Sequence, residues 1–337
     1  MASAAALVGR MRAQPPCTVV ELELLVHALL GAVLSGAAEC RAALHAGALQ
    51  VMTVTLRDHV SSQSLAVLAA SAASQIVRDN HEAVDGTARA ALVAATVTAL
   101  RRYGDDSATD GALLFMQALG AALATDAPHA AECAQRAALQ EGFAELAASL
   151  LRGRSRSVLF KFAAVDAAAN FSRGDAGRRA VAAAGCVPLA ARALAEHPGD
   201  ALLFDAVLRL AYYVLIAIDK QLVFTPQGDE AVQSLFPAFV AACAKHRKRA
   251  DLQRRAFAVL RCLPPYTPAQ SQAAGAAGVP AAAVSAPECT DCRGPSARAD
   301  QRVISGFCLR RWRRCARTCR AQATSTSCRT RANCWIT

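Results

Sequence analysis

Three short segments of this chain place a glycine between two alanine-rich helical patterns. They read HAGAL at 45–49, QEGFA at 140–144 and AAGCV at 183–187. Gly47 and Gly142 lie 95 residues apart, which is two units of about 47 residues, and Gly142 and Gly185 lie 43 apart. A period of about 40–47 residues that contains only helices is typical of α-solenoids, in which each unit buries its apolar face against the next. The spacing therefore predicts an all-α chain of stacked helical repeats with one long surface for binding.

The composition supports helices and argues against strands and membrane spans. Apolar residues make up 54% of the chain but aromatic residues only 5%, and alanine, the strongest helix former, supplies much of the difference. No segment alternates β-branched and polar residues between paired turn signals. The longest apolar stretches, such as residues 90–100, fall short of the roughly 18–20 residues that cross a bilayer. We expect no transmembrane helix.

Breaks in the apolar pattern divide the chain into parts. We expect a flexible N-terminus at 1–18, a solenoid at 19–263, a Pro/Ala/Gly linker at 264–288 and a disordered tail at 289–337. Within the solenoid, an apolar helix at 19–34 precedes units at about 39–80, 86–126, 128–174, 175–220 and 226–263. The second unit lacks the glycine segment, and Gly104 separates its two long helices. In the fourth unit, Asp200 is expected to cap a helix on which Asp205 and Arg209 can pair.

The tail differs from the rest of the chain in charge and cysteine content. Residues 287–337 hold 11 Arg and three acidic residues, so they carry +8 of the net charge of +11. Cys289 and Cys292 form a C-x-x-C pair, but no second pair follows at the spacing of a zinc site, so we expect no metal. Because the Arg/Cys/Trp bias suits a GC-rich gene read out of frame, we hypothesise that the tail is a mispredicted exon or a frameshift. A genuine tail would bind RNA or DNA through phosphates.

Two segments resemble the armadillo repeat family. Residues 175–194, DAGRRAVAAAGCVPLAARAL, resemble the opening of an armadillo repeat, and residues 163–175, AAVDAAANFSRGD, are similar to the end of its third helix. The resemblance covers about 240 residues, and it is clear in the third and fourth units and loose elsewhere. It implies a divergent armadillo-like, right-handed superhelix of four to five repeats. It does not separate armadillo from HEAT repeats.

The resemblance also implies a binding surface. In armadillo proteins, asparagines of the third helices grip the backbone of an extended peptide on the concave face, often beside tryptophans one turn earlier. Asn170 matches that position, whereas the two Trp residues, 312 and 335, lie in the tail. An amide can donate and accept at once, so Asn suits the role; the alternative is that Asn170 bonds its own helix end. The expected partner-binding residues are Ser71, Gln75, Asp166, Asn170, Arg209 and Tyr213.

Two basic clusters are further candidates for binding acidic or phosphate groups. The first contains Arg152, Arg154, Arg156 and Lys161. The second contains Lys245, Arg247, Lys248 and Arg249, and Arg254 and Arg255 follow it. Solvated arginines between helices explain the first cluster equally well, and the second also fits an ordinary exposed loop between two helices. The six cysteines before the tail are scattered among apolar neighbours, as in a reducing compartment, so a cytoplasmic protein is expected. The second cluster also resembles a nuclear-import signal, which would add access to the nucleus, and organelle targeting stays open.

Catalysis is not expected. The seven histidines are dispersed, and the chain contains no metalloprotease, nucleophile-elbow or phosphate-loop motif. The sequence therefore predicts a non-catalytic protein-binding scaffold or adaptor without cofactors, whose partner it does not identify. Two alternatives remain: nucleic-acid binding through the tail and residues 245–255, or a HEAT-type assembly subunit with a large flat interface.

Overall fold

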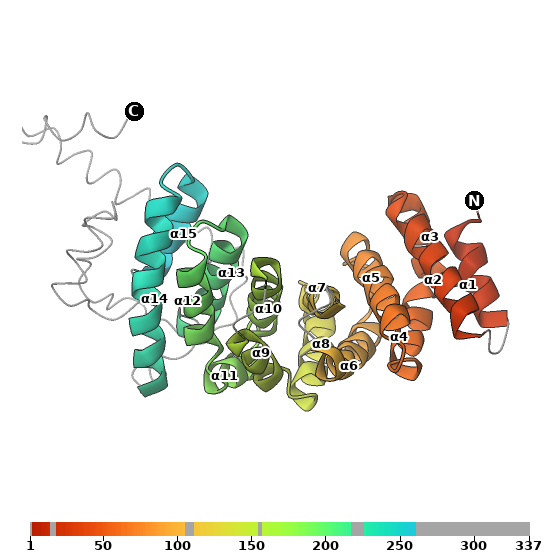
Figure 1. Ribbon diagram of the computed structural model, residues 1–337, viewed down its shortest axis with the longest axis horizontal. Helices are drawn as coiled ribbons and strands as arrows, with labels where there is room; N and C mark the ends of the chain where they lie inside the picture. Colours follow the sequence, from red (N-terminus) through yellow and green to blue (C-terminus); the bar gives the residue numbers. More distant parts are fainter. Residues whose placement is uncertain (1, 14–17, 105–110, 154–156, 217–225, 261–337) are drawn as a thin grey trace, which may run out of the picture. The chain divides into compact units, whose positions relative to one another are not determined.

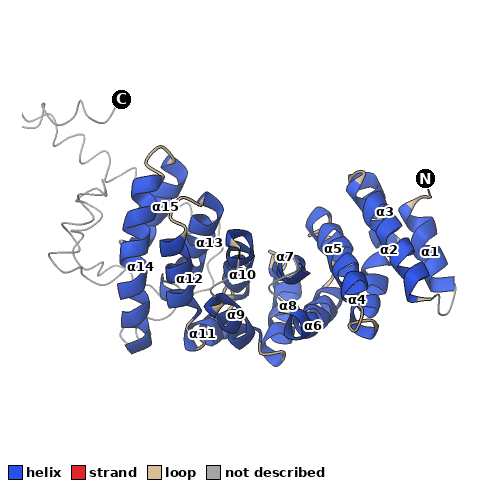
Figure 2. Cartoon of the chain, viewed as in Figure 1, coloured by secondary structure: helices blue, strands red, loops and turns tan. Residues whose placement is uncertain are grey.

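The structure, a computed structural model, describes residues 2–13, 18–104, 111–153, 157–216 and 226–260. Every regular element in these ranges is a helix, and no strand occurs in them (Figures 1 and 2). The all-α prediction is therefore confirmed for this part of the chain. The chain divides into two compact units, Met1–Ala286 and Pro287–Thr337. The expected linker at 264–288 and tail at 289–337 lie outside the described residues.

The helices group into two-helix and three-helix units after an N-terminal pair. The pair is α1 (Ala4–Ala13) and α2 (Val19–Leu34). The three-helix units are α3 (Ala37–His45), α4 (Ala48–Asp58) and α5 (Gln63–Asp79); α8 (Pro128–Gln140), α9 (Phe143–Arg152) and α10 (Val158–Phe171); and α11 (Asp175–Ala183), α12 (Cys186–Glu196) and α13 (Ala201–Ala211), which continues as the π-helical turn η1 (Tyr212–Ile216). The two-helix units are α6 (Gly86–Tyr103) with α7 (Gly111–Leu123), and α14 (Pro226–Lys245) with α15 (Ala250–Leu260).

The three glycines that define the sequence period occupy equivalent places. Gly47, Gly142 and Gly185 each stand between the first and second helix of a three-helix unit, with φ of 83°, 59° and 71°. In each case the glycine N–H donates to the carbonyl three residues earlier, at 2.9–3.0 Å. This left-handed conformation costs glycine nothing and costs other residues energy. The repeated segment therefore marks one recurring turn.

Side-chain caps set several helix starts. The hydroxyl of Thr18 accepts from the backbone N–H of Glu21, whose carboxylate in turn accepts from the backbone N–H of Thr18, at the start of α2. Asp85 and Ser157 cap α6 and α10 in the same position. The carboxylate of Asp200 accepts from the N–H of Leu203 at 2.8 Å, so the predicted cap of α13 is confirmed.

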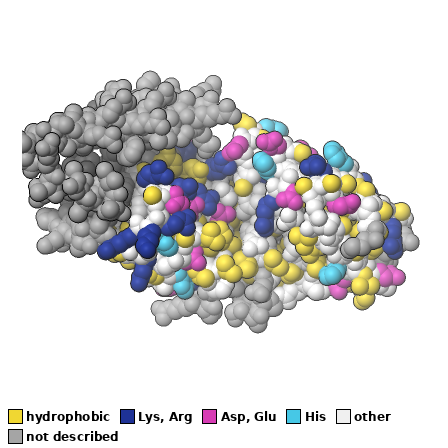
Figure 3. Space-filling view, turned by 90° about the horizontal axis from the view of Figure 1, so that it is seen from above, with side chains coloured by type: hydrophobic (Ala, Val, Ile, Leu, Met, Phe, Trp, Pro, Cys, Tyr) yellow, Lys and Arg dark blue, Asp and Glu magenta, His cyan; other side chains and the backbone are white. Residues whose placement is uncertain are grey.

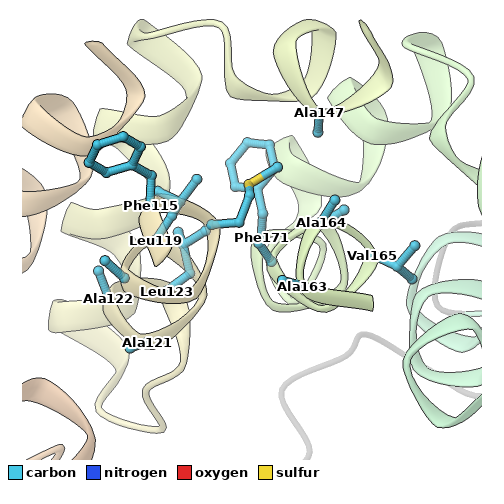
Figure 4. Close-up of a cluster of buried hydrophobic side chains, with 14 of the residues drawn as sticks. Phe115, Leu119, Ala121, Ala122, Leu123, Ala147, Ala163, Ala164, Val165 and Phe171 are labelled. Carbon is cyan, nitrogen blue, oxygen red and sulfur yellow. The ribbon is translucent and has the colours of Figure 1, made fainter. Parts of the chain in front are cut away.

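The last helix of each unit packs against the last helix of the next, and we call α5, α7, α10, α13 and α15 the closing helices. Contacts join α5 to α7, α7 to α10, α10 to α13 and α13 to α15. Alanines fill much of this interface, and their single methyl groups let the helices approach closely. Figure 4 shows apolar side chains from α7 and α10, among them Phe115, Leu119 and Phe171, in one buried cluster.

The N-terminus differs from the expectation of a flexible segment at 1–18. Residues 4–13 form α1, which packs against α2, α3 and α4. Ala4, Leu7 and Val8 are buried, and the N–H of Ala4 donates to a carboxylate oxygen of Glu39 at 2.9 Å. Three apolar residues on one turn and a half are too few for the periodicity to predict a helix, and the docking surface that stabilises them comes from other helices.

The second unit lacks the glycine turn, as its sequence predicted. Here α6 runs through the place where the glycine stands in the other units. The side chain of Arg89 on α6 is fully buried, and no carboxylate of the described residues bonds to it. Its guanidinium donates instead to five backbone carbonyls: Val84 at 3.3 Å, Ala121 at 3.2 Å, Ala122 at 3.0 Å, Ala124 at 3.4 Å, and His81. Three of these acceptors lie at the C-terminal end of α7, where helices leave carbonyls without partners.

No helix in the described ranges is long and apolar enough to span a bilayer.

Candidate interaction surface on the closing helices

The structure brings three of the predicted binding residues together. Asp166 and Asn170 lie one turn apart on α10, and Arg209 lies on the neighbouring helix α13. A guanidinium nitrogen of Arg209 donates to Oδ1 of Asp166 at 2.6 Å. Two residues predicted from corresponding positions of successive units therefore lie within hydrogen-bonding distance of one another.

Two residues that were not predicted as binding residues extend this contact. Asp205, four residues before Arg209 on α13, accepts from Nε of Arg209 at 3.2 Å, so the expected pairing within that helix is confirmed. The other oxygen of Asp205 accepts from Arg255 of α15. Helical spacing was the signal for Asp205, whereas nothing in the sequence connects Arg255 to it. We call Asn170, Asp166, Arg209, Asp205 and Arg255 the polar network; it crosses α10, α13 and α15.

The polar network is reached by solvent. The side chains of Arg209 and Asp166 are 33% and 26% exposed, and that of Arg255 is more open. Burial alone would lower the pKa of Arg209, but Asp166 and then Asp205 favour the charged form, and the pKa of Arg209 is raised overall. The guanidinium therefore stays charged, and the two carboxylates balance it.

Asn170 is nearly buried beneath this network. Its side-chain amide is directed at the carbonyl oxygen of Gly120 on α7 and at Oδ2 of Asp166, both at 3.4 Å. These contacts are long, so they hold the amide weakly. Asn170 thus links α7 to α10 and supports the carboxylate of Asp166.

The other predicted binding residues are not part of the polar network. The hydroxyl of Ser71 donates to the carbonyl of Val67, and the amide of Gln75 donates to Asp79, both at 2.9 Å and within α5. Tyr213 is half-buried in η1 and packs edge-on against Tyr212, with ring centroids 5.7 Å apart. The side chains of Ser71 and Gln75 therefore bond within their own helix, α5.

Exposed leucines stand beside the polar network on the same helix faces. Leu159 precedes Asp166 by seven residues on α10, and Leu202 precedes Arg209 by seven on α13, so each pair lies on one face two turns apart. Leu159 is 53% exposed and Leu202 is 57% exposed. The surface of α10 and α13 thus offers apolar side chains next to charged ones.

The structure describes two residues of the first basic cluster, Arg152 and Lys161. Lys161 is buried, and its ammonium group pairs with Glu196 of α12, which also lies 3.9 Å from Arg192. The expectation that Lys161 is available to a partner is therefore wrong, because its helix face packs against α12. Arg152 is exposed at the end of α9, and Arg154 and Arg156 lie outside the described residues.

The second basic cluster is open. Lys245, at the end of α14, and Arg247, Lys248 and Arg249, which follow it before α15, are all exposed, and we call them the cationic turn. Arg249 pairs with Asp251 at 2.9 Å, whereas the other three have no ion-pair partner among the described residues. In Figure 3, Lys and Arg side chains gather on the surface beside the grey residues.

Chemical groups for metal binding or thiol chemistry do not converge. The described residues contain no cluster of three or more His, Cys, Asp or Glu side chains that could hold a metal. Burial raises the pKa of Cys186 and of Cys243 to about 12, and that of Cys40 to about 11, so these thiols stay protonated. They pack as small apolar side chains.

Comparison with known proteins identifies no family. No family model and no curated protein matches the chain. Among solved structures, the crystal structure of an engineered protein from the Northeast Structural Genomics Consortium is similar, with a TM-score of 0.55 and 18% sequence identity. The alignment covers 78% of this chain and 99% of the engineered one. That likeness concerns the fold alone.

Proposed function

We infer that this chain is a non-catalytic adaptor whose closing helices form the inner, peptide-binding face of an armadillo-like, right-handed α-solenoid. The observation that carries the proposal is the polar network with its flanking exposed leucines. The recurring left-handed glycine turn and the succession of closing helices support the solenoid.

The polar network suits binding because its groups can change partners cheaply. Ion pairs that solvent reaches contribute little to folding stability, about 0–1 kcal/mol each, so another chain can replace them at small cost. Carboxylates accept backbone N–H groups, and guanidinium groups donate to backbone carbonyls. An incoming peptide would therefore find both kinds of partner for its main chain.

The leucines would supply the apolar part of the interface. Burying exposed apolar surface contributes about 25 cal/mol per Å², and Leu159 and Leu202 are both more than half exposed. Packed helix axes lie about 8–10 Å apart, and an extended chain advances about 3.3 Å per residue. A bound segment that crosses α10 and α13 would thus present a residue to each leucine about every third position.

A random peptide library displayed on phage tests this proposal with the full chain as bait. We expect enrichment of peptides with apolar residues three positions apart, and loss of their binding to the double variant Leu159→Glu/Leu202→Glu. The matched control is Val54→Glu/Leu139→Glu, which changes two exposed apolar residues of α4 and α8. Peptides that bind all three proteins equally, or no enrichment, would refute the proposal.

A further inference from the structure

The cationic turn concentrates unpaired positive charge next to the proposed binding face. Between positions 245 and 255 the chain carries six basic residues and one acidic residue. Lys245, Arg247 and Lys248 project without a carboxylate beside them among the described residues. Most cations of α8–α13 are, by contrast, paired, for example Arg136 with Glu132 and Arg178 with Asp175.

The backbone under these cations is held by specific contacts. The ring of His246 stacks on the buried ring of Phe204 from α13, with centroids 5.8 Å apart and planes 24° apart. The side-chain amide of Gln253 donates to the carbonyls of Cys243 at 2.8 Å and His246 at 3.2 Å. The N–H of Arg249 donates to the same His246 carbonyl at 2.9 Å. The charges therefore sit on an ordered support, which lowers the entropy lost on binding.

The polar network reaches α15, the helix that follows the cationic turn. Arg255, one residue after Arg254 on α15, reaches Asp205, which in turn bonds Arg209. Charge thus changes along the surface, from a balanced network on α10 and α13 to an excess of cations at the turn that precedes α15. A ligand that occupies the network and extends toward α15 would meet positive charge there.

We propose that the cationic turn binds an acidic segment of the protein partner that lies on the closing helices. This inference rests on the proposed function and adds the chemistry of one end of the partner: Asp- or Glu-rich sequence next to the apolar positions. Long-range attraction to the turn would also speed and orient the encounter.

An acidic polypeptide suits this surface better than a nucleic acid. A nucleic acid is negatively charged along its whole length, so the carboxylates of Asp166 and Asp205 would repel the part of it that lies on the polar network. A polypeptide can be acidic at the turn and uncharged over the network. Single-stranded nucleic acids gain affinity by stacking bases on exposed aromatic rings. Phe204 is buried beneath the turn, and Tyr212 and Tyr213 pack against each other.

Fluorescence anisotropy with a labelled decaglutamate peptide tests the proposal on the full chain. The variant Lys245→Gln/Arg247→Gln/Lys248→Gln should weaken binding at least about tenfold at low salt, and the difference should shrink as salt rises. The matched control, Arg10→Gln/Arg41→Gln/Arg179→Gln, removes three exposed cations of α1, α3 and α11 and should bind like the unaltered chain.

Carbodiimide cross-linking locates the contact directly, because the chain has only four lysines: 161, 220, 245 and 248. The reagent activates a glutamate carboxyl of the peptide, and the lysine amine displaces the activating group to form an amide. We expect peptide–protein amides at Lys245 and Lys248. An arginine-rich segment elsewhere cannot give this product.

Three results would overturn the inference. The first is an equal loss of decaglutamate affinity in the two triple variants. The second is cross-linking at amines other than those of Lys245 and Lys248. The third is tighter binding of a short DNA duplex or single-stranded RNA than of decaglutamate. The proposed function fails separately, when Leu159→Glu/Leu202→Glu leaves library peptides bound. If the enriched library peptides lack acidic residues and bind the triple variant as tightly as the unaltered chain, the proposed function stands and only this inference is refuted.

Discussion

Two regions use arginine to join helices, and they do so in different ways. In the α6–α7 unit, Arg89 is fully buried and, among the described residues, bonds to backbone carbonyls alone. In the α10–α13–α15 region, Arg209 is one-third exposed and lies between two carboxylates. Water cannot replace the contacts of the first arginine, and it can replace those of the second. The difference separates a group that is committed to folding from a group that is available to a ligand.

The sharpest test of this comparison is Arg89→Met. The substitution keeps the length and apolar stem but leaves the carbonyls at the end of α7 buried without donors, each at a cost of about 1–3 kcal/mol. We expect a loss of about 3–5 kcal/mol in the free energy of unfolding, measured by urea denaturation and circular dichroism. Arg102→Met, on the exposed face of the same helix, should change stability by less than about 0.5 kcal/mol. Equal effects would show that Arg89 is not a structural cap.

The parallel change at Arg209 should have a smaller effect. Arg209→Met leaves Asp166 and Asp205 facing each other across α10 and α13, but solvent partly hydrates both carboxylates. We expect a loss of about 1–2 kcal/mol that shrinks in high salt, whereas the loss at Arg89 should not change with salt. A double-mutant cycle with Asp166→Asn measures the pair itself, and strict additivity would mean that the 2.6 Å contact contributes nothing.

The glycine turn extends the comparison to the units that contain it. A methyl group at Gly185 would meet no atom within 4 Å, so Gly185→Ala isolates the cost of the left-handed backbone. We expect a loss of about 1 kcal/mol in thermal or urea unfolding. Gly31→Ala also has open space but lies inside α2, where it should stabilise the chain by a similar amount. If both substitutions changed the free energy of unfolding in the same direction, the left-handed turn at Gly185 would be contradicted.

The smallest effect on stability is expected from the ion pair between the buried Lys161 and Glu196. The hydrogen bond from Lys161 holds the pKa of Glu196 below its usual value of 4.5. A lowered folded-state pKa stabilises the protein fully above about pH 4.5, and that stability is lost as the pH falls through the folded value. Glu196→Gln should therefore flatten the acid side of the stability profile measured by urea denaturation, and an unchanged slope would contradict this role of the ion pair.

Local features of the fold could be predicted from the sequence because local rules control them. The position of Gly142, the cap at Asp200 and the pairing of Asp205 with Arg209 depend on spacing within one or two turns. Contacts that depend on how a neighbouring helix packs could not be predicted. Arg89 looks like any helix-surface arginine until α7 is in place, and Lys161 looks exposed until α12 covers it. Asp166 was identified because it lies one turn before Asn170, whereas the contact of Arg255 depends on where α15 packs.

The abundance of alanine in the core has a consequence for how this protein tolerates variation. Ala66, Ala69, Ala70 and Ala73 on α5, and Ala164, Ala167 and Ala168 on α10, are all fully inaccessible to solvent. Almost any mutation at such a position adds atoms, so damage comes from crowding and forced displacement of a neighbouring helix, and empty space seldom forms. Variants of this chain should therefore tolerate glycine or serine at these alanine positions far more readily than valine or leucine.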